Sequence, residues 1–212
     1  MSFIGIIGWI ISGLNVTLLV LLYTAIVAFC FAFPLGIAEY FLRGWARTIV
    51  SGFIDIWRGS SVVLLLFFLY YVLPAAGLYL NAYAVSAIAI GFNIGAYGSQ
   101  ALRSSLESIP RGQIEAGLSL GLHRSRVLLL IELPQACRKM IPIIGNEIIA
   151  IIKTSANVSL IGLADMTFRA KEIMQTTYQP AQIYSGLLLV YLMICLPIAL
   201  VVRKLARNER VR

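Results

Sequence analysis

The sequence predicts an all-α integral membrane protein that forms one domain over residues 1–212 and crosses the bilayer about five times. Two observations support this prediction. The chain is 60% hydrophobic and only 12% charged, whereas about a quarter of the residues of a soluble domain are charged. It also has no charged residue between Gly59 and Leu102. An apolar run of that length is helical in lipid, because a lone strand would leave its backbone groups without hydrogen-bond partners.

The first apolar segment, Phe3–Ile11, is too short to cross a bilayer, which takes about 20 apolar residues. We expect it to lie at the membrane interface, with Trp9 as an anchor.

Five longer apolar segments predict the spanning helices. They cover approximately residues 14–42, 49–73, 83–102, 140–163 and 183–202. Lysine and arginine cluster after the first, third and fifth of these segments. Basic residues of this kind mark cytoplasmic loops, so we expect the N-terminus outside the cytoplasm and the C-terminus inside. Five helices are few to enclose a pathway, which favours a pore between two chains.

The placement of the charges also excludes several classes of function. A net charge of +8 would favour a nucleic-acid partner in a soluble protein. Here the basic residues lie beside the predicted spans, which indicates contact with a lipid bilayer and no nucleic acid. The three cysteines lie far apart without CxxC spacing, and the single histidine lies outside the spans. We therefore expect no disulfide framework, no metal site, no cofactor and no catalytic residues.

Two of the predicted spans carry polar residues that indicate either a solute pathway or contacts between helices. In the second span, Asp55 and Arg58 share one helix face. Alternatively, this span begins after both residues, and their side chains lie at the interface. In the third span, Asn93, Tyr97 and Gln100 lie on one face, where neighbouring glycines make close helix packing easy.

The fourth span is more polar. It carries Glu147 and Lys153, which are costly inside a bilayer, followed by hydroxyl and amide side chains that can replace water around a polar solute. Alternatively, these groups only pair with one another. The candidate pathway residues are Arg58, Ser60, Asn93, Tyr97, Ser155, Asn157, Ser159 and Asp165. We expect Asp165 to pair with an ammonium group of the solute and Arg58 with a carboxylate.

The long basic loop over residues 108–134 predicts two short helices. Ser108 is expected to cap a helix that begins near Pro110. Gly121 is expected to end that helix in the left-handed conformation. A second helix begins near Ser125 and is followed by Pro134.

Small residues on the first of these helices suit it to a groove in another protein. Ala116 and Gly117 are small residues, so little protrudes from the helix surface beside Glu115. Alternatively, the segment is a surface loop that touches lipid headgroups through Arg124 and Arg126. That alternative does not explain the spacing of the small residues, the glycine and the proline.

The same loop resembles the EAA motif of ATP-binding-cassette (ABC) importer permeases, E-A-A-x-x-x-G-x9-I-x-L-P. The corresponding residues here are Glu115, Ala116, Gly117, Gly121, Ile131, Leu133 and Pro134. The departure is Gly117, where the family has alanine. Glycine weakens a helix by up to about 1 kcal/mol. The resemblance implies a type I ABC importer permease fold.

Three further segments resemble the polar amino acid branch of these permeases, the histidine, glutamine and arginine type. They are WRGSS at 57–61, YYVLP at 70–74 and KTSANVSLIGLADM at 153–166. Ser61 replaces a proline of the branch pattern, and the residues around Ala156 and Asn157 differ from it too. The resemblance covers nearly the whole chain from about Leu14 on.

The resemblance implies a permease of a bacterial inner membrane that works by alternating access. Its partners would be a cytoplasmic ABC ATPase dimer, a second permease chain (identical or different) and an extracytoplasmic solute-binding protein. The residues that would couple to the ATPase are Glu115, Ala116, Gly117, Gly121, Ile131 and Pro134. The chain has no G-x-x-x-x-G-K-[ST] pattern, so ATP would be bound by the partner, and this chain is not expected to be an enzyme. The alternatives are import of an opine or another small polar solute, and a passive channel.

Overall fold

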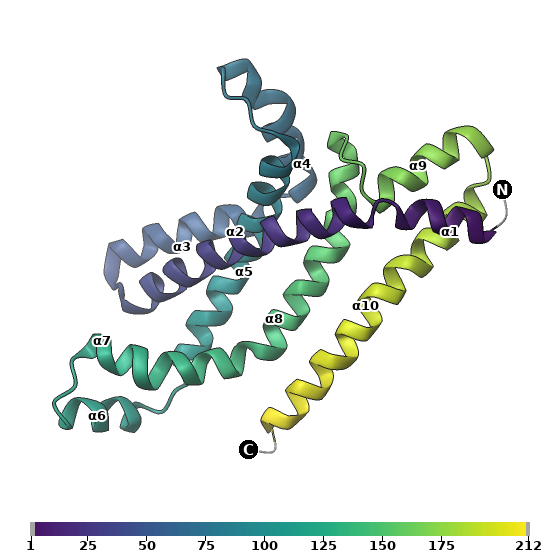
Figure 1. Ribbon diagram of the computed structural model, residues 1–212. Helices are drawn as coiled ribbons and strands as arrows, with labels where there is room; N and C mark the ends of the chain where they lie inside the picture. Colours follow the sequence, from purple (N-terminus) through teal and green to yellow (C-terminus); the bar gives the residue numbers. More distant parts are fainter. Residues whose placement is uncertain (1–2, 211–212) are drawn as a thin grey trace.

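The computed structural model describes residues 3–210, with side chains described up to Leu205. All regular elements within that range are helical, as the sequence predicts. The α-helices are α1 Phe3–Ile11, α2 Leu14–Phe41, α3 Gly44–Gly59, α4 Val62–Phe67, α5 Ala82–Glu107, α6 Arg111–Ser119, α7 Arg124–Val127, α8 Leu133–Ser155, α9 Met166–Thr177 and α10 Pro180–Arg210. Short π or 3₁₀ turns occupy Phe68–Val72, Leu73–Ala76, Leu128–Glu132 and Ala156–Ile161. Figure 1 shows α6 and α7 at one end of the molecule and α1 and α9 at the other.

The helices α1 and α2 run almost in line (Figure 1) and together form one candidate membrane span of 39 residues, Phe3–Phe41. At 1.5 Å per residue this helix is about 58 Å long, about twice the thickness of the hydrocarbon core. Part of it therefore extends beyond the core. The buried side chains of Ile6 and Ile10 pack in one cluster with Met166 of α9 and Ile183 of α10. The first segment is thus a packed extension of α2, and its place at the membrane interface stays a prediction.

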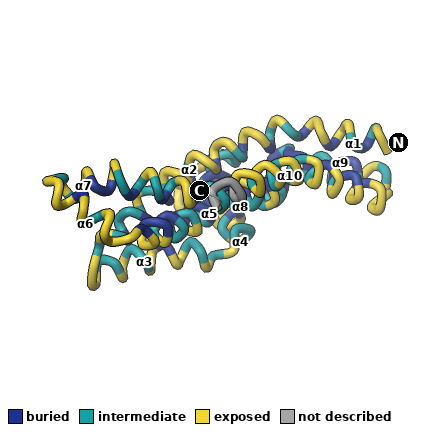
Figure 2. The backbone as a smooth tube through the Cα atoms, turned by 90° about the horizontal axis from the view of Figure 1, so that it is seen from below, coloured by how far each residue is buried: buried dark blue, intermediate teal, exposed yellow. Residues whose placement is uncertain are grey.

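The helices α2 and α5 form the centre of the molecule, and the predicted close packing at glycine is confirmed there. A Cβ atom on Gly95 would lie 2.8 Å from the carbonyl oxygen of Ala28, and one on Gly91 would lie 2.8 Å from Val27 Cγ1. Small residues at such positions allow two helix backbones to approach closely. Figure 2 shows buried positions through the middle of the molecule and exposed positions along its outer faces.

The second predicted span, 49–73, is not one straight helix, which corrects that expectation. The axes of α3 and of the helix that begins with α4 meet at 91°. The bend occurs at Ser60 and Ser61, whose backbones are both extended. The Asn93 side-chain amide donates hydrogen bonds to the carbonyl oxygens of Trp57 and Ser60 at 2.8 and 3.2 Å. These bonds satisfy carbonyl groups that the break leaves without helical partners.

The helix of the fourth predicted span begins earlier than expected. It continues from Arg124 through Pro134 to Ile161, so the expectation of a separate helix that stops before Pro134 is wrong. The π turn at Leu128–Glu132 precedes the proline. We attribute the continuity to this wider turn, because a proline ring in a regular helix clashes with the carbonyl group one turn earlier.

By length and apolar composition, two helices of the described chain can each cross a membrane, Phe3–Phe41 and Pro180–Leu205. Two bent pairs can each form one further span. One is α3 with the helix of α4, and the other is Arg124–Ile161 with α9, which meet at 50°. The third predicted segment, 83–102, forms part of α5, which is not among these candidates. The number of five spans and their orientation therefore stay predictions.

Candidate functional site

Residues 111–132 form a helical hairpin at one end of the molecule (Figure 1). Its first limb is α6, its second limb contains α7 and the π turn, and Gly121 lies between them. Gly121 N donates to the carbonyl oxygen of Leu118 at 3.0 Å, and Leu122 N donates to that of Gly117 at 3.2 Å. This pair of bonds is the Schellman arrangement that ends many helices. Gly121 has φ +80°, so the predicted left-handed conformation is confirmed.

Gly117 lies where the two limbs of the hairpin meet. It is buried, and a Cβ atom on it would lie 2.8 Å from Ile131 Cδ1 and 3.1 Å from Val127 Cγ2. The expectation that Gly117 adds to the outer surface of α6 is therefore wrong, because this position faces the second limb. Its neighbours Glu115 and Ala116 are exposed, as a surface for a partner requires.

The outer face of the hairpin combines apolar and charged side chains. Leu118 is 44% exposed and Leu120 is 83% exposed. Glu115 lines a groove of about 640 Å³ together with Arg43 and Arg111. The hairpin thus offers exposed apolar side chains and a charged groove to a partner.

Ser108 does not cap α6, which corrects that prediction. It instead follows the last residue of α5, and its Oγ donates to the carbonyl oxygen of Ser105 at 2.7 Å. The same Oγ accepts a hydrogen bond from Lys139 Nζ at 2.7 Å. Because α5 extends to Glu107, Ser108 closes that helix, and α6 begins after Pro110 without a side-chain cap.

A buried ion pair holds the second limb of the hairpin. Glu132 is fully buried, its Oε2 accepts from Arg124 Nη1 at 2.6 Å, and its Oε1 accepts from Tyr40 Oη at 3.0 Å. Arg124 Nη2 also donates to Tyr40 Oη at 3.2 Å. The Arg124 guanidinium lies 4.8 Å from the centre of the Phe41 ring. Tyr40 and Phe41 end α2, so the second limb is attached to that helix.

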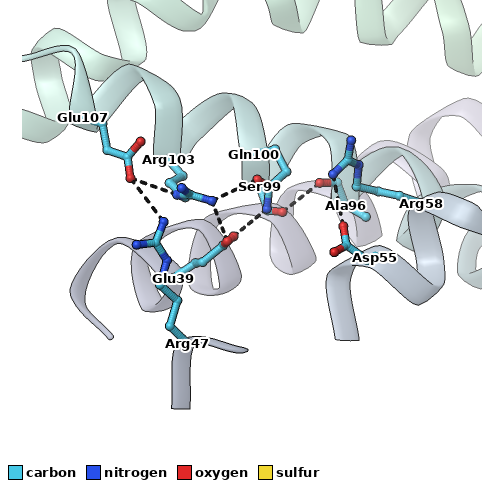
Figure 3. A network of polar contacts seen from close by, with 9 residues as sticks. All are labelled: Glu39, Arg47, Asp55, Arg58, Ala96, Ser99, Gln100, Arg103 and Glu107. Carbon is cyan, nitrogen blue, oxygen red and sulfur yellow. Dashed lines mark hydrogen bonds and ion pairs between the residues drawn. The ribbon is translucent and has the colours of Figure 1, made fainter. Parts of the chain in front are cut away.

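A second buried carboxylate, Glu39, lies in α2 directly before Tyr40. Glu39 is 1% exposed and accepts hydrogen bonds from Arg103 Nη1 at 2.6 Å and from Gln100 Nε2 at 2.5 Å (Figure 3). Arg103 Nε also donates to Glu107 Oε1 at 3.0 Å, and that oxygen lies 3.6 Å from Arg47 Nη2. The network joins α2, α3 and α5, so Gln100 makes a contact between helices.

Four candidate pathway residues come together where α3 meets α5. Arg58 pairs with Asp55 at 3.2 Å, and its guanidinium lies 5.2 Å from the centre of the Tyr97 ring. Tyr97 Oη donates to the carbonyl oxygen of Arg58 at 3.3 Å, and Asn93 donates to that of Ser60. Asn93 therefore makes a contact between helices. The side chain of Arg58 is 38% exposed, so this group offers an accessible cation at the helix break.

Three other candidates lie where α8 passes into the 3₁₀ turn. Ser155 and Ser159 are buried, and each hydroxyl donates to a backbone carbonyl oxygen three residues earlier. Ser159 Oγ also accepts from Lys171 Nζ at 2.9 Å. Asn157 is half-buried in the turn. Among the described side chains, no hydrogen bond or ion pair joins this group to the one around Arg58.

Asp165 is the N-cap of α9 and not a free carboxylate near the outer face. It is fully buried, and its two oxygens accept hydrogen bonds from the backbone N–H groups of Phe168 and Thr167 at 2.9 and 3.2 Å. Its backbone also lies against α2, because a Cβ atom on Gly13 would come within 2.6 Å of the Asp165 carbonyl oxygen. Asp165 therefore has a structural role as the N-cap of α9, and its pairing with a solute stays a prediction.

A groove of about 240 Å³ between α2, α5 and α8 contains another carboxylate. Glu147 is half-buried there, and within the part of the chain that the structure describes it makes no hydrogen bond or ion pair. The other lining residues are apolar or small, among them Phe29, Gly95 and Met140. A carboxylate in apolar surroundings is stabilised by a cation, so this groove suits the ammonium group of a small ligand.

The described side chains contain no group of three or more His, Cys, Asp or Glu residues that could hold a metal ion. Cys30, Cys137 and Cys195 are all free thiols.

Comparison with known sequences gives a family match over most of the chain. The profile of the family described as "binding-protein-dependent transport system inner membrane component" matches residues 28–211. The glutamine transport system permease protein GlnP of Escherichia coli (strain K12) is 31% identical over 208 residues, which cover 95% of this chain and 93% of the relative. The L-cystine transport system permease protein TcyB of Bacillus subtilis (strain 168) is 33% identical over 163 residues, which cover 76% of this chain and 70% of the relative.

Comparison with solved structures shows the same fold over the full chain. A crystal structure of an amino acid ABC transporter with histidines superimposes with a TM-score of 0.86 at 26% sequence identity. The superposition covers 100% of this chain and 99% of the other.

Proposed function

The chain belongs to the family of binding-protein-dependent transport system inner membrane components and is a permease subunit with the fold of ABC importers, and we propose that the solute it carries is a polar amino acid. Two relatives that match most of the chain support this proposal, because their names describe permeases of glutamine and L-cystine transport systems. The three segments that resemble the polar amino acid branch also support it. An opine or another small polar solute is the alternative within the same class.

The structure of the hairpin at 111–132 is the main support for our proposal that this chain couples to an ATPase. Gly117 packs against Ile131 and Val127 between the two limbs of the hairpin, while Glu115, Leu118 and Leu120 are exposed. On our proposal, the two leucines enter a groove of the ATPase and Glu115 pairs with a cation beside that groove. Closure of the ATPase pair on ATP then draws the hairpins together and shifts the permease between two states. ATP is hydrolysed by the partner, and this chain supplies no catalytic group.

The groove around Glu147 is the proposed site for the ammonium group of the solute, in place of Asp165. Glu147 is the half-buried carboxylate without a partner among the described residues, and three helices line its groove. Arg58 does not line this groove. It stays a candidate for a solute carboxylate at a separate position on the pathway, because its side chain is accessible at the bend between α3 and α4. Movement of α2 or α5 against α8 would open or close this groove.

The remaining partners follow from the class of transporter. A second permease chain would complete the pathway, and an extracytoplasmic binding protein would deliver the solute at the end opposite the hairpin. In the view of Figure 1 the hairpin and the C-terminal end of α10 both lie on the lower side of the molecule. Both segments are basic, which supports one cytoplasmic side. The membrane would be the bacterial inner membrane.

A charge reversal on the hairpin tests the docking surface. In the purified complex with its ATPase, Glu115→Lys is expected to insert in the membrane but to lose solute-stimulated ATP hydrolysis. Gln182→Lys is the control, because it adds a lysine at an exposed position at the start of α10. Normal stimulation in Glu115→Lys would contradict the proposed surface.

The same assay identifies the solute. Binding proteins loaded with different solutes are compared for their ability to stimulate ATP hydrolysis. Stimulation by a polar amino acid supports the proposal, whereas stimulation by an opine alone would replace it.

A further inference from the structure

Two consecutive residues of α2 contact the helix that leads into the coupling hairpin and the end of its second limb. Glu39 binds Arg103 at 2.6 Å, four residues before the end of α5 and just before the short linker to α6. Tyr40 binds Glu132 at 3.0 Å, at the end of the second limb. Glu39 thus contacts the chain before the hairpin, and Tyr40 contacts it at the end of the hairpin. Glu39 and Arg103 are 64 residues apart in the sequence, and Tyr40 and Glu132 are 92 residues apart.

Both contacts are built around buried charge. Glu39 and Glu132 are at most 1% exposed, and each pairs with one arginine at 2.6 Å. Separating Glu39 from Arg103 would leave a buried carboxylate without compensation, which is strongly unfavourable. The pair of Glu132 and Arg124 lies within the second limb, which is joined to α2 by the Tyr40 hydroxyl. The rings of Tyr40 and Phe41 add cation–π contacts to Arg124 at 5.6 and 4.8 Å. The contacts therefore resist the separation of the hairpin from α2.

We infer that Glu39 and Tyr40 are positioning residues that clamp to α2 the helix leading into the coupling hairpin and the end of its second limb, so that the hairpin and this end of α2 move as one body. The inference rests on the proposed coupling of the hairpin to an ATPase. The outer face with Leu118 and Leu120 takes no part in the clamp and stays available to the partner.

Through the clamp, a movement of the hairpin would be transmitted to the groove that contains Glu147. The helices α2 and α5 pack with close backbone contact at Gly91 and Gly95, so a displacement at one end is carried along both. Both helices line the groove that contains Glu147, whose own helix is α8. Movement of the hairpin with α2 and α5 would therefore change the shape of the groove against α8.

Distances between paired spin labels test whether the clamp is rigid. Cys30, Cys137 and Cys195 are first replaced by serine in the complex with its ATPase. One pair of labels is placed at Trp45 and Gly112, which are both exposed, one on each side of the clamp. A reference pair at Gly112 and Gln182 joins the hairpin to the start of α10, outside the clamp.

If the clamp is rigid, ATP should change the distance between the labels at Gly112 and Gln182 by about 5 Å, comparable with one turn of a helix. The distance between the labels at Trp45 and Gly112 should stay unchanged. If both pairs move, the clamp is wrong and the coupling function stands. If neither pair moves on ATP, the proposed coupling fails, and the inference fails with it.

The double variant Glu39→Gln with Tyr40→Phe tests the named residues. It removes one buried charge and the hydroxyl contact, and it keeps the size of both side chains. We expect a broader distance distribution for the clamp pair and a loss of about fivefold or more in solute transported per ATP hydrolysed. Tyr23→Phe is the control on the same helix, because no hydrogen bond of the Tyr23 hydroxyl occurs among the described residues.

Transport per ATP is a ratio, so a smaller amount of folded protein does not change it. A double variant with an unchanged ratio and an unchanged distance distribution would overturn the inference. Failure of the variant to assemble with the ATPase would also overturn it, because a positioning role predicts an assembled complex with poor coupling.

Discussion

The turn of the coupling hairpin depends on Gly121, and Gly121→Ala is expected to loosen it. Gly121 has φ +80°, and no atom lies within 4 Å of the place where a Cβ atom would stand. The substitution therefore causes backbone strain without a steric clash. A left-handed residue other than glycine costs about 1–2 kcal/mol, which corresponds to an opening equilibrium about 5–30 times more favourable.

Hydrogen exchange of the peptide that covers residues 113–134 measures this effect. The amide protons of Gly121 and Leu122 report on the turn, because both donate to carbonyl groups of α6. Gly112→Ala is the matched control. Gly112 also has open space around it but lies within α6 without a positive φ, so alanine there should stabilise the helix by up to about 1 kcal/mol. Exchange in Gly121→Ala as slow as in the unchanged protein would refute the proposed role of the turn.

Two further predictions concern packing and the solute. Gly13→Ala should lower the apparent melting temperature by roughly 2–12 °C, because its Cβ atom would meet backbone atoms of Asp165 at 2.5–2.6 Å. Gly8→Ala, with nothing within 4 Å, should not lower it, and equal melting of the two variants would argue against the close contact. Glu147→Gln should raise the KM for a solute with an ammonium group about tenfold or more, measured as binding-protein-dependent uptake. Asp165→Ala should instead lower the melting temperature and leave that KM nearly unchanged, and the opposite pattern would return the solute site to Asp165.

Local patterns in the sequence predicted the features that local physics determines. The left-handed Gly121 and the glycines of α5 could be identified because each depends on residue type at a short spacing. The bend after α3 has a local cue too, since Gly59 is followed by Ser60 and Ser61. That cue was outweighed by the apolar run on both sides.

The buried carboxylates could not be predicted from local patterns. Glu39 lies two residues before the end of α2, and Glu132 lies in the loop that the sequence predicts over residues 108–134. A charged residue at either place is ordinarily exposed. Their partners Arg103 and Tyr40 are 64 and 92 residues away, and only the packing of α2 against α5 and the hairpin brings them together. Asp165 is a different case, because an aspartate directly before a helix is a preferred N-cap, and this local cue was available.

Gly117 shows how a motif can be matched while the role of one residue is misjudged. The EAA spacing identifies the hairpin, and the small size of residue 117 predicts a place for it on the outer surface. In the fold, this position contacts Ile131, another residue of the motif. Part of the motif therefore holds the hairpin together, and the exposed part is left for a partner.

The most direct test of the central claim is uptake of a polar amino acid by the complex reconstituted in lipid vesicles. The complex contains this permease, its ATPase and its binding protein, and labelled solute is measured inside the vesicles over time. Accumulation is expected to require ATP on the side of the hairpin and to be lost in Glu115→Lys. Uptake at the same rate without ATP or without the ATPase would contradict this expectation and would identify a passive channel.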